Sequence, residues 1–285
     1  MNILNRRKTV GARENRELEW HVTAKKEKKK IAVIGISRGA GSTFLSVSLA
    51  FLFSMSKNVE SVERILPADV TLIEMRPLEQ DEPALYYSAA LDRRFRERRF
   101  TDVFSLILKG QSVPQTVNLH KGIHWVVQKT PRNHSEELCC FSQMAAEFPL
   151  EQMPGSYIIA DSPPLDSLHR YDLVIAVIDP LPSAVYAGAQ RYESLRDMEE
   201  SGLPVMWVIN KDNESVNHSA LKRFLKLQDY VCLPLQRMEL IYQAEYEGKL
   251  AVELAEGKLN VFMGAVQRRL EQISGESEVP SSCTE

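Results

Sequence analysis

Short apolar segments recur along the chain and alternate with longer segments of helical periodicity. Most of the short segments are continuously hydrophobic, which is typical of parallel strands that are buried on both faces. The segments that predict strands are 31–34, 70–73, 123–127, 157–160, 173–178, 205–209 and 231–233. Helices are predicted at 43–56, 100–109, 135–147, 184–200, 219–226 and 258–273. The pattern therefore predicts an α/β fold, a mostly parallel sheet with helices on both faces.

The predicted elements form one domain, residues 31–273, between a basic N-terminal arm, 1–30, and an acidic tail, 274–285, which we expect to be disordered. The chain as a whole has a net charge of −3, whereas the arm is strongly basic. A basic arm binds nucleic acid, an anionic membrane or an acidic partner in some proteins, but a flexible, solvated leader is the simpler interpretation.

Hydropathy and cysteine content indicate the cellular compartment of the protein. The longest apolar run, around 49–53, is far shorter than the roughly 20 residues that a membrane-spanning helix needs. The N-terminus lacks the hydrophobic core of a signal peptide. Cys139, Cys140, Cys232 and Cys283 lack the spacing of a zinc site, which favours free thiols in a reducing compartment. We therefore expect a cytoplasmic protein, which a membrane-associated assembly could recruit.

A glycine-rich turn after the first predicted strand indicates a phosphate-binding loop. In the Walker A pattern G-x-x-x-x-G-K-[ST], backbone N–H groups cradle the phosphates, the lysine neutralises them and the hydroxyl holds Mg²⁺. Here Thr43 occupies the hydroxyl position, whereas Ser42 stands where the lysine belongs. The positive end of the following helix still favours an anion at this place.

Two later strands end in residues that would complete a nucleotide site. Asp161 follows the apolar strand of "YIIADSPP", as does a Walker B carboxylate that holds Mg²⁺. Asn210 begins "NKDN", which is similar to the guanine-reading N-K-x-D but ends in Asn213, so adenine fits better by elimination. A simpler interpretation is a loop in which Asp212 or Asn213 caps the next helix.

Together these motifs resemble the MinD/ParA deviant-Walker ATPases and, within them, the TadZ/CpaE-like proteins of Tad pilus assembly. The resemblance spans most of the predicted domain and rests on "SRGAGST", "VTLIEMRP", "FTDVFSLILKGQ" with "GIHWVVQKTP", "YIIADSPP", "YDLVIAVIDPLPSA" and "GLPVMWVINK". It implies a homodimer that sandwiches ATP and Mg²⁺, with a signature lysine reaching the partner's phosphates. Ser37 stands at that lysine position, and Arg38 takes the role only if the register moves by one residue. TadZ/CpaE-like members commonly have a small residue where this chain has Ser42.

The second-strand motif departs from the family pattern, because Glu74 preserves one acid while Arg76 replaces the other. Without the loop lysine and the water-orienting acid, transition-state charge has too little compensation, so we expect a pseudo-ATPase. ATP with Mg²⁺ would bind weakly or not at all. The expected Mg²⁺ ligands are Thr43 and Asp161, and the expected nucleotide-binding residues are Ser37, Arg38, Gly39, Ala40, Gly41, Ser42, Thr43 and Asn210.

Three functions agree with this pattern. The first is a positioning or assembly factor with impaired ATP hydrolysis that self-associates as a homodimer and contacts proteins of a Tad-type pilus or secretion system. The second is an active partitioning ATPase of the ParA/MinD type, with Arg38 in place of the missing lysine. The third is a scaffold that binds no nucleotide.

Overall fold

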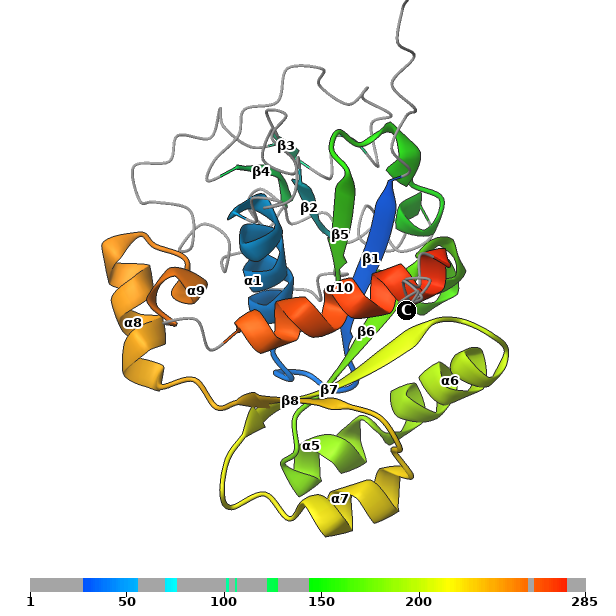
Figure 1. Cartoon of the computed structure of the whole chain (residues 1–285), viewed down its shortest axis with the longest axis vertical. Coiled ribbons are helices and arrows are strands. Elements are labelled where there is room, and N and C mark those ends of the chain that lie inside the picture. Colours follow the sequence, from blue (N-terminus) through cyan, green and yellow to red (C-terminus); the bar gives the residue numbers. More distant parts are fainter. Residues whose placement is uncertain are drawn as a thin grey trace, which may run out of the picture.

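The computed structural model describes residues 28–55, 70–75, 101–102, 106, 122–127, 144–255 and 259–275. Its centre is a sheet of eight parallel strands in the order β3-β4-β2-β5-β1-β6-β7-β8 (Figure 1). The strands are β1 (Lys29–Gly35), β2 (Val70–Glu74), β3 (Thr101–Asp102), β4 (Ile123–Val127), β5 (Tyr157–Asp161), β6 (Leu173–Ile178), β7 (Val205–Asp212) and β8 (Val231–Pro234). The predicted α/β class with a mostly parallel sheet is confirmed.

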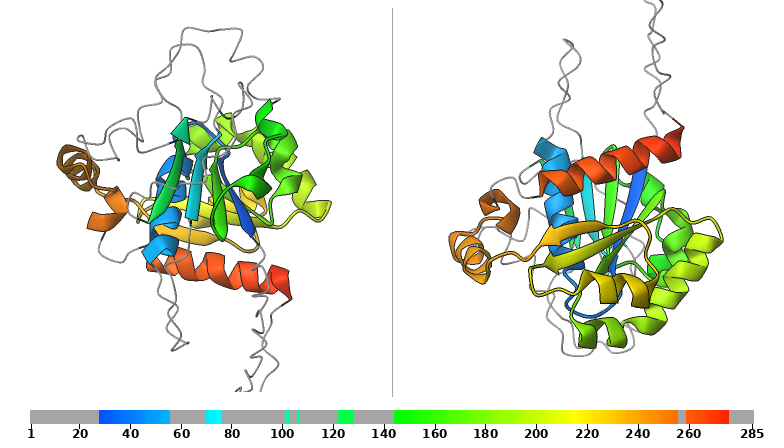
Figure 2. Two further views of the ribbon diagram at one scale, coloured as in Figure 1. Left: turned by 90° about the horizontal axis from the view of Figure 1, so that it is seen from above. Right: turned by 60° about the horizontal axis from the view of Figure 1, so that its bottom comes forward.

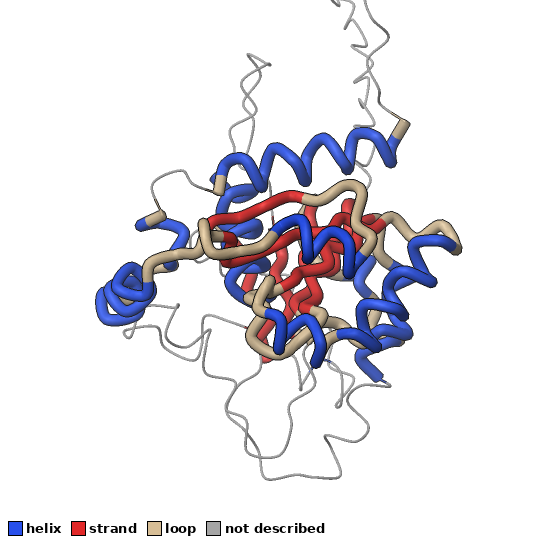
Figure 3. The backbone as a smooth tube through the Cα atoms, turned by 90° about the horizontal axis from the view of Figure 1, so that it is seen from below, coloured by secondary structure: helices blue, strands red, loops and turns tan. Residues whose placement is uncertain are grey.

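Helices cover both faces of the sheet. They are α1 (Ser42–Met55), α5 (Pro182–Ala187), α6 (Ala189–Glu200), α7 (His218–Leu225), α8 (Met238–Glu247), α9 (Ala251–Leu254) and α10 (Asn260–Ser274), with the 3-10 helices η2 (Leu150–Gln152) and η3 (Leu165–Arg170). Figure 2 shows α10 on one side of the sheet and α5, α6 and α7 on the other, and Figure 3 shows the strands enclosed between these layers. The described residues include no helix with the length and hydropathy needed to cross a membrane.

The central strand β1 shows why the apolar segments are continuous. Ile31 and Val33 point into the core formed with α1, α9 and α10, whereas Ala32 and Ile34 point into the core formed with α5, α6 and α7. These four side chains are at most 2% exposed. Because successive side chains of a strand point to opposite faces, a strand covered on both sides must be apolar at every position.

Several predicted boundaries differ from the structure. β1 begins at Lys29, so the last residues of the predicted arm belong to the sheet, while 1–27 lie outside the described residues. The helix predicted at 100–109 is wrong at its start, where Thr101–Asp102 form the edge strand β3. The helix predicted at 184–200 divides into α5 and α6 at Gly188. A Cβ at Gly188 would lie 2.8 Å from the carbonyl oxygen of Ile36, so only glycine fits there.

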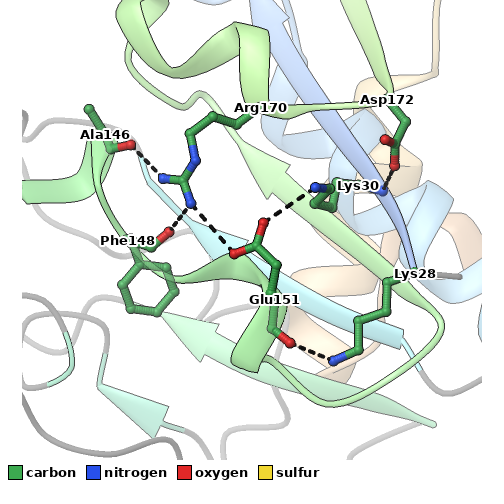
Figure 4. Close-up of polar contacts among 7 residues, drawn as sticks. All are labelled: Lys28, Lys30, Ala146, Phe148, Glu151, Arg170 and Asp172. Atoms are coloured by element: carbon green, nitrogen blue, oxygen red, sulfur yellow. Dashed lines mark hydrogen bonds and ion pairs between the residues drawn. The ribbon is translucent and has the colours of Figure 1, made fainter. Parts of the chain in front are cut away.

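A polar network holds the amino ends of β1 and β6 at the edge of the sheet where these strands begin (Figure 4). The backbone N–H of Lys30 donates to Asp172 at 2.6 Å, and the Lys30 ammonium lies 3.3 Å from a Glu151 carboxylate oxygen. Lys28 donates to the carbonyls of Glu151 and Met153. These bonds hold the first residues of β1 against the segment that precedes β5.

Arg170 is the half-buried centre of the same network. Its guanidinium donates to the carbonyls of Ala146 at 2.5 Å and Phe148 at 2.6 Å, and lies 3.7 Å from Glu151. A hydrogen bond from its own backbone, with smaller contributions from Lys30 and Arg170, lowers the pKa of Glu151. A lowered pKa means that the stabilisation by ionised Glu151 is present at neutral pH and is lost as the pH falls through the folded-state value.

Replacing Arg170 should therefore destabilise the fold. We expect Arg170→Ala to lower the free energy of unfolding by about 1.5–3 kcal/mol, because the two carbonyls lose charge-assisted bonds. The matched control is Arg237→Ala, since Arg237 pairs with Glu239 at the surface with 77% of its side chain exposed. That change should stay within about 0.5 kcal/mol of wild type. Urea unfolding measures both, and equal stabilities for the two variants would contradict the assignment.

Candidate nucleotide site

The glycine-rich loop lies where the carboxyl ends of the central strands meet the amino end of α1. β1 pairs in parallel with β5 and β6, and the N–H of Ile36 continues this pairing by donating to Val177 at 3.0 Å. The loop then reverses through Gly39 and Gly41, whose φ angles are +77° and +95°. These angles lie in the left-handed region that favours glycine. The loop therefore leads into the amino end of α1, where the first N–H groups of a helix have no partner within the helix itself.

Asp161, at the end of β5, is held by hydroxyl groups. Thr43 Oγ1 donates to its Oδ2 at 2.8 Å, while Ser162 Oγ and Ser46 Oγ donate to its Oδ1 at 3.1 and 3.3 Å. Asp161 is 1% exposed, so these bonds compensate the desolvation of its carboxylate. The structure thus brings together the hydroxyl and the carboxylate that the sequence assigns to Mg²⁺.

Ser42, which stands in the place of the Walker A lysine, contacts the end of β5. Its Oγ lies 3.1 Å from the Oγ of Ser162, whose φ of +51° turns the chain back toward the loop. The position therefore holds a small hydroxyl in a local hydrogen-bond network where the Walker A pattern has a cation.

Glu74 places a second acid beside Asp161. The parallel register of β2 and β5 pairs Glu74 with Asp161, and the N–H of Met75 donates to the Asp161 carbonyl at 2.9 Å. Glu74 is 2% exposed. Arg76, which the sequence places in the position of the second acid of this motif, lies outside the described residues. The described part of the site is therefore rich in acids and hydroxyls.

Side chains from β7 and α6 hold the loop from outside. Asn210 Nδ2 donates to the carbonyl of Ala40 at 2.9 Å, and Lys211 Nζ donates to the carbonyl of Gly39 at 2.7 Å. Lys211 also pairs with Asp179 at 2.6 Å, and Arg191 donates to the carbonyl of Gly35 at 3.1 Å. Asn210 thus lies at the loop, where it contacts the backbone, and its expected role in binding a nucleotide stays a prediction.

The loop contacts of Lys211 and Arg191, and the pairing of Lys211 with Asp179, were not anticipated from the sequence. In the sequence, "NKDN" marked the end of β7 and "VIDP" the end of β6. These strands are adjacent in the sheet, so the polar residues at their ends were the available signal for these contacts. The expected capping role of Asp212 or Asn213 is wrong, because Asn217 caps α7 by accepting a hydrogen bond from the N–H of Ala220 at 2.9 Å.

Ser37 and Arg38 form the outer part of the loop. Arg38 and Gly39 are exposed, whereas Ser37 Oγ is buried and has no hydrogen-bond partner within the described ranges. A buried hydroxyl without a hydrogen-bond partner, together with the amino end of α1, fits a phosphate group. Oxygen donors from Thr43 and Asp161 fit Mg²⁺, which prefers oxygen ligands. The residues present therefore fit a nucleotide with Mg²⁺, but supply no lysine at position 42.

Comparison with solved structures shows which proteins share this fold. The chain is similar to a ParA family ATPase from Chlorobium tepidum TLS, with 12% identity, a TM-score of 0.60 and coverage of 88% of this chain and 100% of that chain. A plasmid partition protein from Borrelia burgdorferi B31 bound to AMPPNP shares 17% identity, with a TM-score of 0.59 and coverage of 84% and 100%. The septum site-determining protein MinD from Pyrococcus horikoshii OT3, complexed with Mg-ADP, shares 12% identity, with a TM-score of 0.54 and coverage of 89% and 98%.

No protein-family model and no curated protein sequence matched the chain. At these low identities, the structural similarity establishes the fold alone, which is that of the ParA/MinD-type P-loop proteins. The function has to be argued from the residues of the site.

The packing of Gly41 against Asn210 leads to a test of the loop. A Cβ at Gly41 would lie 2.3 Å from Asn210 Nδ2, so Gly41→Ala should displace Asn210 from Ala40. The matched control is Gly202→Ala, because Gly202 has a similar φ of +102° and a Cβ there would meet no atom within 4 Å. Both variants strain the backbone by about 1–2 kcal/mol, and overpacking should add roughly 1–3 kcal/mol at position 41 alone. Equal losses in chemical denaturation would show that the Asn210 contact does not hold the loop.

Proposed function

We propose that this chain is a ParA/MinD-like P-loop protein that binds ATP with Mg²⁺ weakly, has impaired ATP hydrolysis and acts as a positioning or assembly factor. The observation that carries the proposal is the 2.8 Å hydrogen bond between Thr43 and Asp161 beside a serine at position 42. The groups that hold Mg²⁺ are retained, whereas the cation that assists phosphate transfer is replaced.

Binding rests on the backbone and on two side chains. The first-turn N–H groups of α1 and the associated helix dipole favour a phosphate by about 0.3–2 kcal/mol. Thr43 and Asp161 are the residues that would hold Mg²⁺, and a bound Mg²⁺ would neutralise phosphate charge. The AMPPNP and Mg-ADP complexes of two structural neighbours support nucleotide binding by a protein of this fold.

Impaired hydrolysis follows from the charges around the loop. Lys211 and Arg191 contact carbonyl oxygens of the loop, and Lys211 is also paired with Asp179. Glu74 and Asp161 contribute carboxylates beside the loop, where developing negative charge would need donors. Removing a single transition-state donor costs roughly 2.7–4 kcal/mol, or 10²–10³ in rate. The site is therefore better suited to holding a nucleotide than to hydrolysing it.

The biological role is inferred from the fold. A ParA family ATPase, a plasmid partition protein and a septum site-determining protein share this fold, which supports a role in placing or assembling a larger structure. The resemblance to TadZ/CpaE-like proteins narrows this role to a Tad-type pilus or secretion assembly, with a homodimer as the working unit. An active partitioning ATPase and a scaffold without nucleotide are the competing functions.

Calorimetric titration with ATP and Mg²⁺ tests the proposed nucleotide binding. We expect wild type to bind with micromolar or weaker affinity. Thr43→Ala and Asp161→Asn should each weaken binding by roughly ten-fold, since each removes a group expected to hold Mg²⁺, and Ser42→Lys should strengthen it by a similar factor. The matched control is Ser48→Ala, because the Ser48 hydroxyl donates to the carbonyl of Phe44 within the same helix.

A phosphate-release assay on the same proteins tests the proposed impairment of ATP hydrolysis. Wild type should be indistinguishable from the buffer background. Steady turnover that Arg38→Ala abolishes would instead favour the active ATPase. Absence of binding in wild type and in Ser42→Lys would leave only the scaffold.

Self-association is a separate prediction, because the homodimer is implied by the resemblance. Sedimentation velocity over a range of protein concentrations should show a reversible dimer, and ATP with Mg²⁺ should strengthen it only weakly because Ser37 replaces the signature lysine. A monomer at high concentration, both with and without nucleotide, would count against a sandwich arrangement.

A further inference from the structure

Three potential metal ligands converge beside β7, outside the contacts that hold the loop. Asp212 is the last residue of β7, His218 is the first residue of α7 and Cys232 lies in β8. One carboxylate oxygen, one imidazole nitrogen and the thiol sulfur lie within 4.8 Å of one another, and His218 Nε2 is 2.9 Å from Asp212 Oδ1. Among the described residues, no other group of three such side chains comes together in this way.

The backbone explains how residues so far apart in sequence meet. Ile209 pairs with Cys232, but the register shifts before Asp212 pairs with Pro234, and Lys211 within this irregularity has a φ of +61°. A bulge of this kind re-aims the side chains that follow it. The N–H of Leu235 then donates to the carbonyl of Asp212 at 2.8 Å, which fixes the end of β7 against the residue that follows β8.

His218 is positioned by the start of α7. Asn217 caps the helix and thereby places His218 at its first position, beside the carboxylate of Asp212. The cluster is consequently built by two strands and a helix, all of which pack into the core. Such a site is more rigid than one assembled on loops.

A second observation points to a ligand. Asp212 Oδ1 is buried and lies 2.9 Å from His218 Nε2, and the Cys232 thiol is hydrogen-bonded to the same carboxylate, but Oδ1 itself accepts no well-formed hydrogen bond within the described residues. A cation bound between the three side chains would compensate this buried oxygen. The His218 side chain is 40% exposed, so an ion from solvent has a path to the cluster.

The donor set selects the metal. Mg²⁺ and Ca²⁺ prefer sites made of oxygen, whereas a thiol, an imidazole and a carboxylate are the ligand types of Zn²⁺. Zinc bonds of about 2.0–2.3 Å place tetrahedral donors roughly 3.3–3.8 Å apart, so small side-chain rotations would close the cluster. We propose that Asp212, His218 and Cys232 bind one Zn²⁺ ion, with water as the fourth ligand.

Zinc titration of the full chain after chelator treatment tests the proposal. Competition with a chromophoric chelator should show one equivalent of Zn²⁺ bound, and the melting temperature should rise by several degrees because the ion binds only the folded state. Cys232→Ser and His218→Gln should each weaken binding by at least ten-fold. The double variant Cys139→Ser/Cys140→Ser and the single variant His169→Gln are matched controls that should bind as wild type does.

Cobalt gives a second readout that does not depend on the folding of the cysteine variant. Wild type loaded with Co²⁺ should show thiolate-to-cobalt charge-transfer absorption, and His218→Gln, altered at a partly exposed helix start, should lose most of it at the same Co²⁺ concentration. Absence of stoichiometric Zn²⁺ binding, equal binding by ligand variants and wild type, or loss of binding only in the Cys139/Cys140 control would overturn the proposal.

Discussion

The parallel pairing of β1 with both β5 and β6 is the constraint on which the candidate site depends. It brings the glycine loop after β1 beside Asp161 at the end of β5 and beside Asp179, which follows β6. Parallel strands need long crossovers through helices, so residues that meet at this edge are far apart in sequence. Thr43, in the first turn of α1, reaches Asp161 only because this pairing places the end of β5 beside the loop that joins β1 to α1.

The loop has side-chain hydrogen bonds that hold its backbone, whereas it has no lysine at position 42 to bind phosphate. The carbonyls of Gly35, Gly39 and Ala40 each accept a hydrogen bond from a side chain of α6 or β7, and a Cβ at Gly41 or Gly188 would clash with its neighbours. These contacts hold the shape of a P-loop independently of any ligand. The loop therefore keeps this conformation with a serine at position 42, where the Walker A pattern has a lysine.

The end of β7 joins the two candidate sites. Asn210 and Lys211 contact the loop, whereas Asp212 turns toward His218 and Cys232. The left-handed backbone at Lys211 and the irregular register with β8 make this division possible, because they interrupt the regular alternation of side chains along the strand. A metal at Asp212 would stiffen the strand end that carries the loop contacts, so the two sites share one rigid element.

Sequence alone determined every strand of the sheet except the edge strand β3, because a strand buried on both faces is continuously apolar. The bounds of β4 and β6 agree with the predicted ranges 123–127 and 173–178. The sequence analysis missed α8, because its exposed Met238, Tyr242 and Tyr246 obscure the amphipathic pattern. It also missed the edge strand Thr101–Asp102, because two residues are too few to produce a hydrophobic pattern.

For the site, spacing within one motif identified Thr43, and a carboxylate after an apolar strand identified Asp161. Tertiary structure alone decided that Lys211 and Arg191 hold the loop, since their contacts depend on the order of the strands and the path of α6. It also decided that Asp212 and His218 meet Cys232. Their spacing resembles no metal motif, and a register shift between two strands, which no local pattern encodes, brings them together.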